Sequence, residues 1–501
     1  MYKKIFAFVV ATSAALTLHA CGSAPVTGAD SIVNSSANAN ETTQNDTASQ
    51  DSTEPSDTTV ADSVADFHNT PVFICRKEGE EQELILDDAS KEKFPAFSSS
   101  WYNYMNTSKK ESSHYIRRCD SHYVSVLAHS TVSTGGANDS DAYTSKNYDI
   151  QTGKEISFDD VISDKEALTS LILDQLENNP EGSYSAYPEI VDSIADNIDN
   201  IDNPTWTMDA DGITLILGPY VNVGPFTSLN IPIFIPYSSD LINKDYAALE
   251  NTGYITSLVP LYPFSCDLGN DGSIDTVSFC KDNKSDGILI NINDNSSVIE
   301  KVDLADEWLD GYLAVTAGGK HFLLLEGESP ESFMNVIDID DGTPAVMPMG
   351  KKLKKTLKLD EDEIGYLYIP TNTATISLSC RFDLLSTYDA YKIYSFTEDG
   401  RFVTEDPYYM INMFRPLISE KEIACEVVDQ AGEVKGKDSI PSLTDYTLYR
   451  TDGYNFVDAM VGDGKIIRLN LEHTDSDGFF SININGVPAE DLFEMLYYRN
   501  N

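Results

Sequence analysis

Three aspartates spaced four residues apart are the first residues in this chain that could do chemistry. Asp267, Asp271 and Asp275 take positions 1, 5 and 9 of a short segment that also contains Gly269 and Gly272. Ca²⁺ takes about six to eight oxygen ligands, and a curled loop with carboxylates at this spacing can supply several of them. The sequence therefore predicts a calcium site here, with calcium as its cofactor.

The same segment also fits a plain Asp-Gly hairpin turn. Its spacing resembles the calcium loops of FG-GAP repeats, but Gly269 stands where those loops carry Asp or Asn, and no Glu follows at position 12. Asp-Gly is also a common turn dipeptide, because Gly tolerates positive φ. The sequence leaves both alternatives open.

Cys21 is the second candidate, and its expected chemistry is lipidation. A positively charged start and an apolar run over residues 5–18 have the proportions of a secretory signal. The run ends in Leu18-His19-Ala20-Cys21-Gly22, which resembles the bacterial lipobox. The resemblance implies that residues 1–20 are a lipoprotein signal peptide. It also implies a chain that is extracytoplasmic, lipid-anchored to the outer face of the bacterial cytoplasmic membrane and facing the cell wall; an ordinary cleaved signal is the alternative.

Residues 21–66 have the composition of a linker. Beyond Cys21 they contain no aromatic residue, no Lys and no Arg, and most are Ser, Thr, Asn, Ala and Asp. Such a chain cannot bury enough apolar surface to offset the entropy lost on ordering. The sequence predicts a disordered, lipid-anchored linker that spans roughly 35–40 Å as a flexible coil.

The charge balance excludes one class of partner and favours another. The 501 residues include 81 Asp and Glu against 34 Lys and Arg, a formal net charge of −47 at pH 7. Nucleic acid is excluded, because phosphate binding needs clustered Lys and Arg. An acidic surface attracts Ca²⁺ and cationic proteins and speeds their association. A surface that is acidic only for solubility is the alternative.

Residues 67–262 have the mixed pattern of an α+β domain. Alternating runs predict strands over residues 122–127 and 214–217, and Asp211-Gly212 predicts a hairpin turn. A capping box over residues 163–166 precedes a helix whose apolar face is formed by Leu168, Leu171, Ile172 and Leu176. A weaker helix is expected over residues 189–198.

A series of motifs in this half resembles a known extracytoplasmic domain. In chain order they are Arg118-Cys119-Asp120-Ser121, Gly135-Gly136-Ala137, Asn147-Tyr148-Asp149 with Thr152-Gly153-Lys154, Gly218-Pro219-Tyr220, and Ile231 to Tyr237. The series, over roughly residues 70–245, resembles the extracytoplasmic domain of the anti-sigma factor RsiV. Similar domains of unknown function precede the catalytic domain of the deacetylase PdaC. The resemblance implies a surface domain, which in RsiV binds lysozyme.

The motif that carries most of this resemblance is expected to be structural rather than a binding site. Asp149 to Lys154 is a strand-to-turn signal in which Gly153 can take positive φ. Members of the family often have His after Gly-Gly-Ala, where this chain has Asn138. Sigma-factor control is not carried over, because the sequence shows no cytoplasmic anti-sigma segment and no spanning helix.

Residues 263–501 predict a mainly β domain, either propeller-like or a sandwich. Short alternating runs, such as residues 321–325 and 391–396, are separated by Asp-Gly pairs that begin at Asp271, Asp286, Asp310, Asp341, Asp399, Asp452, Asp463 and Asp477. No repeat period is evident. The last amphipathic segment, residues 489–497, is expected to cap the core with Leu492, Phe493 and Leu496.

The cysteines allow disulfides but do not require them. Apart from Cys21 they are Cys75, Cys119, Cys266, Cys280, Cys380 and Cys425. An even number outside the cell permits bridges, with Cys75–Cys119 as the pair of the first half, while buried thiols are an equal alternative. None has the close spacing of a zinc or redox site.

The sequence contains no recognised catalytic motif. Residues 157–161, Ser-Phe-Asp-Asp-Val, are similar to a deacetylase box but lack its Gly, and no His-x-x-x-His pair could hold zinc. They are expected to lead into the helix that begins at Ser163. The Ser-x-x-Lys match at residues 278–281 lies on a predicted strand, where chance explains it better.

The sequence therefore favours a non-catalytic cell-surface lipoprotein. Its expected partners are the membrane, through the lipid, and a cell-wall component such as peptidoglycan or a cationic wall-active protein such as lysozyme. Two alternatives stay open. One is an accessory enzyme that acts on peptidoglycan or glycans through unrecognised carboxylates. The other is a structural surface spacer.

Overall fold

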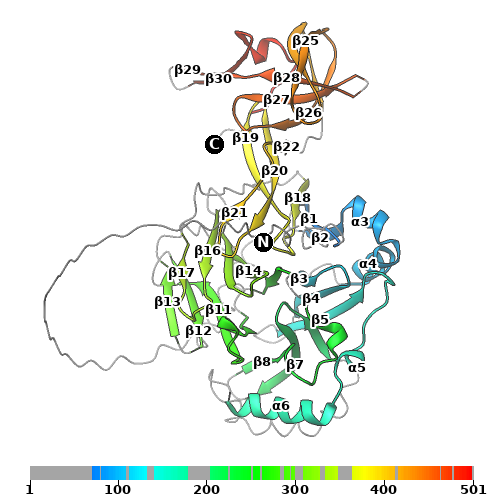
Figure 1. The fold of residues 1–501 in the computed structure, drawn as a ribbon, viewed down its shortest axis with the longest axis vertical. Helices are drawn as coiled ribbons and strands as arrows, with labels where there is room; N and C mark the ends of the chain where they lie inside the picture. The colour runs from blue at the N-terminus through cyan, green and yellow to red at the C-terminus, as the bar shows by residue number, and fades with distance from the viewer. Residues whose placement is uncertain are drawn as a thin grey trace, which may run out of the picture.

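A computed structural model of the chain describes residues 70–498, with gaps at 79–80, 109–111, 133–139, 179–203, 224–225, 250–251, 260–261, 283–286, 294, 300–308, 328–332, 348–363, 412–415, 463 and 477–478. Over these described residues the fold is mostly β, with 53% strand and 14% helix, and the sheets are flat and do not close into a barrel. Figure 1 shows a large body and, beyond the long hairpin β19–β20, a smaller lobe that contains the C-terminus.

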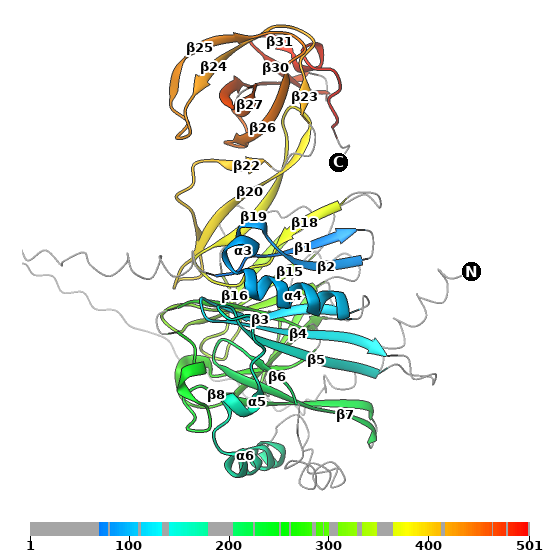
Figure 2. The same ribbon diagram turned by 90° about the vertical axis from the view of Figure 1, so that its right-hand side faces the viewer.

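The first half combines small antiparallel sheets with helices. One sheet consists of β3 (Ser113–Cys119), β4 (Tyr123–Val132) and β5 (Ser140–Asp149), and another of β6 (Thr205–Met208), β7 (Gly212–Val223) and β8 (Phe226–Pro236). The helices are α3 (Asp88–Lys93), α4 (Pro95–Thr107), α5 (Phe158–Val161) and α6 (Lys165–Asn178). In Figure 2 these layers are stacked, with α4 above β3–β5 and α6 below β7 and β8.

Each sheet of this half shares an apolar core with a helix. Phe97 and Trp101 of α4 pack with Val124 and Val126 of β4, and the Trp101 indole N–H donates to the carbonyl of Leu84 at 3.1 Å. Leu168, Ile172 and Leu176 of α6 pack with Ile213, Leu215, Ile231 and Ile233 of β7 and β8. The apolar face predicted for this helix is therefore the face that it buries.

The start of α6 differs in detail from the prediction. Asp164, not Ser163, caps the helix, and its Oδ1 accepts the backbone N–H groups of Glu166 and Ala167 at 3.0 Å each. The hydroxyl of Ser163 instead donates to the carbonyl of Leu241. A capping box does occur upstream, where Ser157 and Asp160 cap α5, so residues 157–161 form a helix of their own. The expected helix over residues 189–198 lies outside the described residues.

The hairpin predicted at Asp211-Gly212 is confirmed. β6 pairs with β7 in antiparallel register, with Met208 opposite Ile213 and Trp206 opposite Leu215. The strands predicted over residues 122–127 and 214–217 lie in β4 and β7, with residue 122 just before β4 begins.

One sheet, which joins the two halves, is buried on both faces over its central strands. Its strands are β9 (Tyr254–Leu258), β14 (Leu309–Val315), β15 (His321–Gly327), β16 (Phe333–Asp338) and β17 (Ala345–Val346). Leu323 and Leu325 face the sheet of β10 (Phe264–Cys266), β11 (Asp275–Lys281), β12 (Ile288–Ile292) and β13 (Asn295–Ile299). Phe322 and Leu324 face the opposite way, because successive side chains of a strand alternate.

These sheets match the sandwich prediction better than the propeller prediction. The four-stranded and five-stranded sheets share one core, as in a sandwich. The described sheets contain three, four, five and ten strands, which does not fit repeated four-stranded propeller blades.

Two sheets join strands from both sides of residue 262, where the sequence predicted a domain boundary. β9 pairs with β14, and β1 (Phe73–Glu78), which also pairs with β2 (Glu81–Leu86), pairs with β18 (Ile364–Tyr368). Backbone hydrogen bonds therefore tie the predicted first domain to the predicted second one.

The C-terminal lobe is built on a ten-stranded sheet. Its strands are β19 (Ile376–Asp383), β20 (Thr387–Phe396), β21 (Phe402–Val403), β22 (Tyr409–Ile411), β23 (Leu417–Ile418), β24 (Ile423–Val428), β25 (Val434–Ile440), β26 (Asp445–Thr451), β27 (Phe456–Val461) and β28 (Lys465–Asn470). A small sheet adds β29 (Glu472–Ser476), β30 (Phe479–Ile484) and β31 (Val487–Pro488). Leu492 and Phe493 are buried in the core of this lobe, as predicted, and Leu496 packs against it.

The hairpin β19–β20 belongs to two cores. Ile376, Leu378 and Phe396, far from its tip, pack against the central sheet of the body. Leu384, Leu385 and Ala390, near its tip, pack in the core of the lobe. The hairpin therefore connects the lobe with the body, as Figure 1 shows.

One predicted turn is wrong. Asp310-Gly311 lies inside β14, where Gly311 pairs with Leu325 and Leu258. A Cβ on Gly311 would lie 2.2 Å from the ring of Phe279, so Gly is needed there for close packing of two sheets rather than for a turn. The predicted turns at Asp271, Asp341, Asp399 and Asp452 do lie between strands, whereas Asp286, Asp463 and Asp477 lie outside the described residues.

Candidate functional site

The motif residue Arg118 is at the centre of a buried polar cluster. Its side chain is 0% exposed, and Nε donates to Oδ2 of Asp120 at 2.6 Å. Nη1 donates to the hydroxyl of Tyr237 at 2.9 Å and to the carbonyl of Tyr246 at 2.7 Å. The guanidinium also lies over the rings of Tyr123, Tyr237 and Tyr254. This residue thus joins β3 to the segment that follows β8.

Asp120 completes this cluster by capping a turn. Its Oδ1 accepts the backbone N–H groups of His122 and Tyr123 at 2.8 Å each. Burial alone lowers the pKa of Arg118, but the charge and hydrogen bond of Asp120 and the nearby tyrosines reverse this and raise it. Because Arg118 is charged and its charge is used inside the fold, the cluster is a structural element rather than a site for a ligand.

Arg117, the neighbour of Arg118, forms a second buried ion pair. Its Nε donates to Oδ1 of Asp209 at 2.8 Å, and its Nη1 donates to the carbonyl of Ser257 at 3.0 Å. Asp209 also accepts the hydroxyls of Thr207 at 3.0 Å and Thr214 at 2.5 Å. The pair therefore holds together β3, β9 and the turn between β6 and β7.

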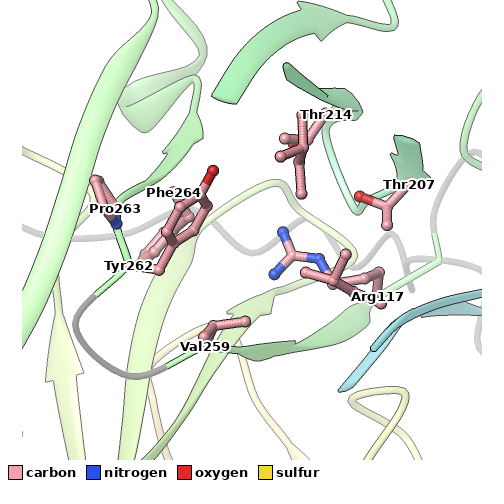
Figure 3. A pocket seen from close by; sticks show the side chains of 9 residues that line it. Arg117, Thr207, Thr214, Val259, Tyr262, Pro263 and Phe264 are labelled. Atoms are coloured by element: carbon pink, nitrogen blue, oxygen red, sulfur yellow. The ribbon is translucent and has the colours of Figure 1, made fainter. Parts of the chain in front are cut away.

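A small cavity lies beside this ion pair. Figure 3 shows the guanidinium of Arg117 directed toward it, with the ring of Tyr262 opposite and Thr207 and Thr214 nearby. The cavity measures about 10 Å³. This is about the space of one water molecule, so a sugar ring does not fit.

His321 lies between two carboxylates and is 0% exposed. Its Nε2 is 2.8 Å from Oδ2 of Asp211, and its Nδ1 is 3.1 Å from Oδ1 of Asp340. Burial lowers the pKa of His321, but hydrogen bonds and charge from both aspartates outweigh it and raise the pKa above 6.5. Only the imidazolium form can donate from both ring nitrogens. This triad joins the β6–β7 turn to β15 and to the end of β16.

These three clusters share the β6–β7 turn, which carries Asp209 and Asp211. Tyr237 links two of them, since its hydroxyl accepts from Arg118 and donates to the carbonyl of Asp209 at 3.0 Å. The sequence pointed to Arg118, Asp120 and Tyr237 through motifs. It gave no signal for Arg117, Asp209 or His321. Arg117 and Asp209 lie 92 positions apart, and His321 and its partner Asp211 lie 110 positions apart.

The predicted calcium loop is described in full. Asp267 accepts the N–H of Gly272 at 3.1 Å, Asp271 that of Ser273 at 2.8 Å, and Asp275 that of Leu268 at 3.0 Å. Gly269 and Gly272 have φ of 71° and 85°, so both are needed for the turn. Within the described residues, no three His, Cys, Asp or Glu side chains are placed to share a metal ion. Calcium binding here stays a prediction, and hydrogen bonds account for the loop without it.

The strand-to-turn prediction at Asp149 to Lys154 is confirmed. β5 ends at Asp149, whose Oδ1 accepts the N–H groups of Gln151 and Thr152 at 2.8 and 2.9 Å. Gly153 has φ of 68°, and a Cβ there would lie 2.5 Å from the carbonyl carbon of Ala96 in α4. The motif therefore shapes a turn that packs closely on a helix.

Other predicted residues are either buried or outside the described part. Cys119, Cys266 and Cys425 are buried thiols without a disulfide, so the Cys75–Cys119 bridge is not formed. Burial raises the pKa of the Cys119 thiol. Cys21 and the segment from Gly135 to Asn138 lie outside the described residues. Of the helices that are described, none has the length and apolar character to cross a membrane.

The comparisons with known proteins give a weak structural likeness. No family model and no curated protein matches the chain. A solved structure of a DUF3298 family protein from Pseudomonas aeruginosa matches with 14% identity, over 36% of this chain and 97% of that chain. The TM-score is 0.21. The resemblance to RsiV and PdaC stays a prediction.

Proposed function

We propose that this protein is a non-catalytic cell-surface lipoprotein that binds a cell-wall component or a cationic wall-active protein such as lysozyme. In this proposal, a lipid on Cys21 holds the chain on the outer face of the bacterial cytoplasmic membrane. Recognition then depends on the surface of the folded part, which faces the cell wall.

The observation that carries the proposal is that basic side chains are bound in ion pairs with carboxylates. Arg117, Arg118 and Arg450 are buried in ion pairs, and Arg468, only 12% exposed, pairs with Asp458, which also binds Arg450. Surface lysines pair with carboxylates too, in Lys91–Asp88, Lys146–Glu155, Lys165–Asp159 and Lys435–Asp429. These eight basic side chains are therefore neutralised locally, while the whole sequence has a formal net charge of −47.

A surface of this kind attracts a cationic protein. Long-range attraction raises the rate of association, and charge complementarity favours partners of the opposite sign. Attraction alone is screened by salt, with a Debye length of about 8 Å at physiological ionic strength. A specific partner must therefore also make short-range contacts.

The buried carboxylates do not favour the alternative of a glycan-cleaving enzyme. A glycosidase needs two carboxyl groups on either side of the scissile bond. Asp120, Asp209 and Asp458 are buried, and each is paired with an arginine. Each of these carboxylates is closed off from solvent and already bound to a buried arginine, so it is a poor candidate for contact with a sugar.

The test is a binding measurement with hen lysozyme and with purified peptidoglycan. The chain from residue 22 onward is used, at low and at physiological salt. We expect saturable binding to one of the two that persists at physiological salt. Binding that disappears with salt, or no binding to either, would contradict the proposal, and release of sugar from peptidoglycan would favour the enzyme.

A further inference from the structure

Three neighbouring backbone segments form one edge of the C-terminal lobe. β23 lies between residues 441–445 on one side and residues 492–495 on the other. The N–H of Leu443 donates to the carbonyl of Ser419 at 2.6 Å, and the N–H of Glu494 donates to the carbonyl of Ile418 at 3.0 Å. Ile418 also pairs with Asp445 at the start of β26. Residues that are far apart in the chain therefore share this surface.

Each of the three segments exposes an apolar side chain. Leu443 is 81% exposed, Met495 77% and Ile418 37%. Single exposed apolar residues are ordinary on a protein surface, but a group on adjacent segments is the usual sign of an interaction site. We call Ile418, Leu443 and Met495 the apolar patch.

The backbone at two of these residues is strained. Leu443 has φ of 60° and Met495 has φ of 146°, which side chains other than Gly rarely adopt. The hydrogen bonds to Ser419 and Ile418 hold the chain in this conformation. Strained residues of this kind cluster at functional sites. Here the strain is combined with side chains, those of Leu443 and Met495, that remain mostly exposed.

Carboxylates lie close to the apolar patch in the chain. Glu420, Asp445 and Glu494 are all exposed and lie within two residues of Ile418, Leu443 or Met495 in the chain. Glu420 is bound to the last segment as well, because its N–H donates to the carbonyl of Leu492 at 2.7 Å. An apolar centre with charged residues around it is the usual arrangement of a protein-binding surface.

We infer that the apolar patch is the docking surface of this lobe for a cationic protein with an apolar depression on its contact face. The inference takes the cationic partner from the proposed function and adds where that partner binds. The acidic rim supplies charge complementarity, and the three apolar side chains supply contacts that salt does not screen. A purely anionic or uncharged partner does not fit this rim.

The experiment compares two pairs of variants for binding to hen lysozyme at physiological salt. Leu443→Asn with Met495→Gln removes the apolar contacts, and Asn tolerates the φ of Leu443. Its control, Tyr102→Gln with Val346→Thr, removes exposed apolar surface from α4 and β17. Glu420→Lys with Glu494→Lys reverses the charge of two rim residues. Its control is Glu92→Lys with Glu405→Lys, which changes the net charge by the same amount at exposed sites elsewhere.

We expect each patch variant to weaken the Kd at least about tenfold and each control to change it less than about threefold. If wild type binds saturably and the patch variants bind equally well, the inference is wrong while the proposed function stands. If wild type does not bind hen lysozyme, or loses binding with salt, a lysozyme-type partner is wrong and the inference falls with it. If Glu92→Lys with Glu405→Lys weakens binding as much as Glu420→Lys with Glu494→Lys, the rim acts through net charge alone and its position on the lobe does not matter.

Discussion

Arg118 and Tyr237 lie 119 positions apart in the sequence, yet Nη1 of the arginine donates to the tyrosine hydroxyl at 2.9 Å inside the protein. Both residues belong to the motif series identified in the sequence. Their contact shows that at least part of that series builds the core of the first half. Arg118 is buried and its polar groups are used inside the fold, so it is not available to a ligand.

Replacement of Arg118 by Met should be strongly destabilising. The substitution leaves Asp120 buried without its counter-charge, which costs about 3–5 kcal/mol in comparable cases. The measurement is the free energy of unfolding in urea. Arg401→Met is the matched control, because Arg401 pairs with Asp399 at the surface, where solvent screens the pair and its loss should matter much less. Equal effects of the two substitutions would contradict the assignment of Arg118.

Replacement of Gly153 by Ala should also be destabilising, by more than about 1 kcal/mol. The new Cβ would meet the backbone of Ala96 at 2.5 Å, and the φ of 68° disfavours any side chain. Gly436→Ala in β25 is the control, since no atom lies within 4 Å of its Cβ position. Thermal unfolding of the two variants tests this prediction, and a neutral Gly153→Ala would refute the close approach to α4.

The His321 triad predicts a pH-dependent stability. The pKa of His321 is raised in the folded protein above about 6.5, the value of an exposed histidine. The stabilisation by Asp211 and Asp340 is therefore fully present below about pH 6.5 and is lost as the pH rises through the folded pKa. Asp338, whose Oδ1 accepts the N–H of Asp340 at 3.1 Å, lies nearby.

The measurement for the triad is the urea unfolding midpoint of wild type and His321→Gln at pH 6 and pH 9. We expect the variant to be less stable than wild type at both values, with the larger difference at pH 6. A difference that does not change with pH would show that the imidazolium is not the form that stabilises the fold. Asp211→Asn should also make the unfolding midpoint less dependent on pH.

Calcium binding at Asp267, Asp271 and Asp275 has a direct test. A calcium site predicts that millimolar Ca²⁺ raises the melting temperature relative to a chelator, by mass action on the folded state. Asp271→Asn should abolish this rise, whereas Asp341→Asn, in another Asp-Gly turn, should leave it unchanged. An unchanged melting temperature in wild type would leave the segment as a hydrogen-bonded turn.

Lipidation predicts where the protein is found in cells. Cys21→Ser removes the thiol that carries the lipid, so the chain should move from the membrane fraction to the soluble extracytoplasmic fraction. Cys75→Ser is the control and should remain in the membrane fraction. A Cys21→Ser protein that stays membrane-bound would contradict the anchor.

By itself, the sequence determined the features that depend on local patterns. The helix over residues 165–178, the hairpin at Asp211-Gly212 and the turn at Gly153 follow from capping residues, apolar periodicity and the conformational freedom of Gly. The tertiary structure decided which residues pair across long separations. With 81 acidic residues, no spacing indicates that Asp209 pairs with Arg117 or that Asp211 and Asp340 enclose His321.

Only the fold also showed that Gly311 packs against Phe279 within a strand and that β1 pairs with β18 across the predicted domain boundary. The physical reason is the same in each case. Local propensity is encoded in neighbouring residues, whereas sheet pairing, burial and ion pairs depend on segments that meet only when the chain has folded.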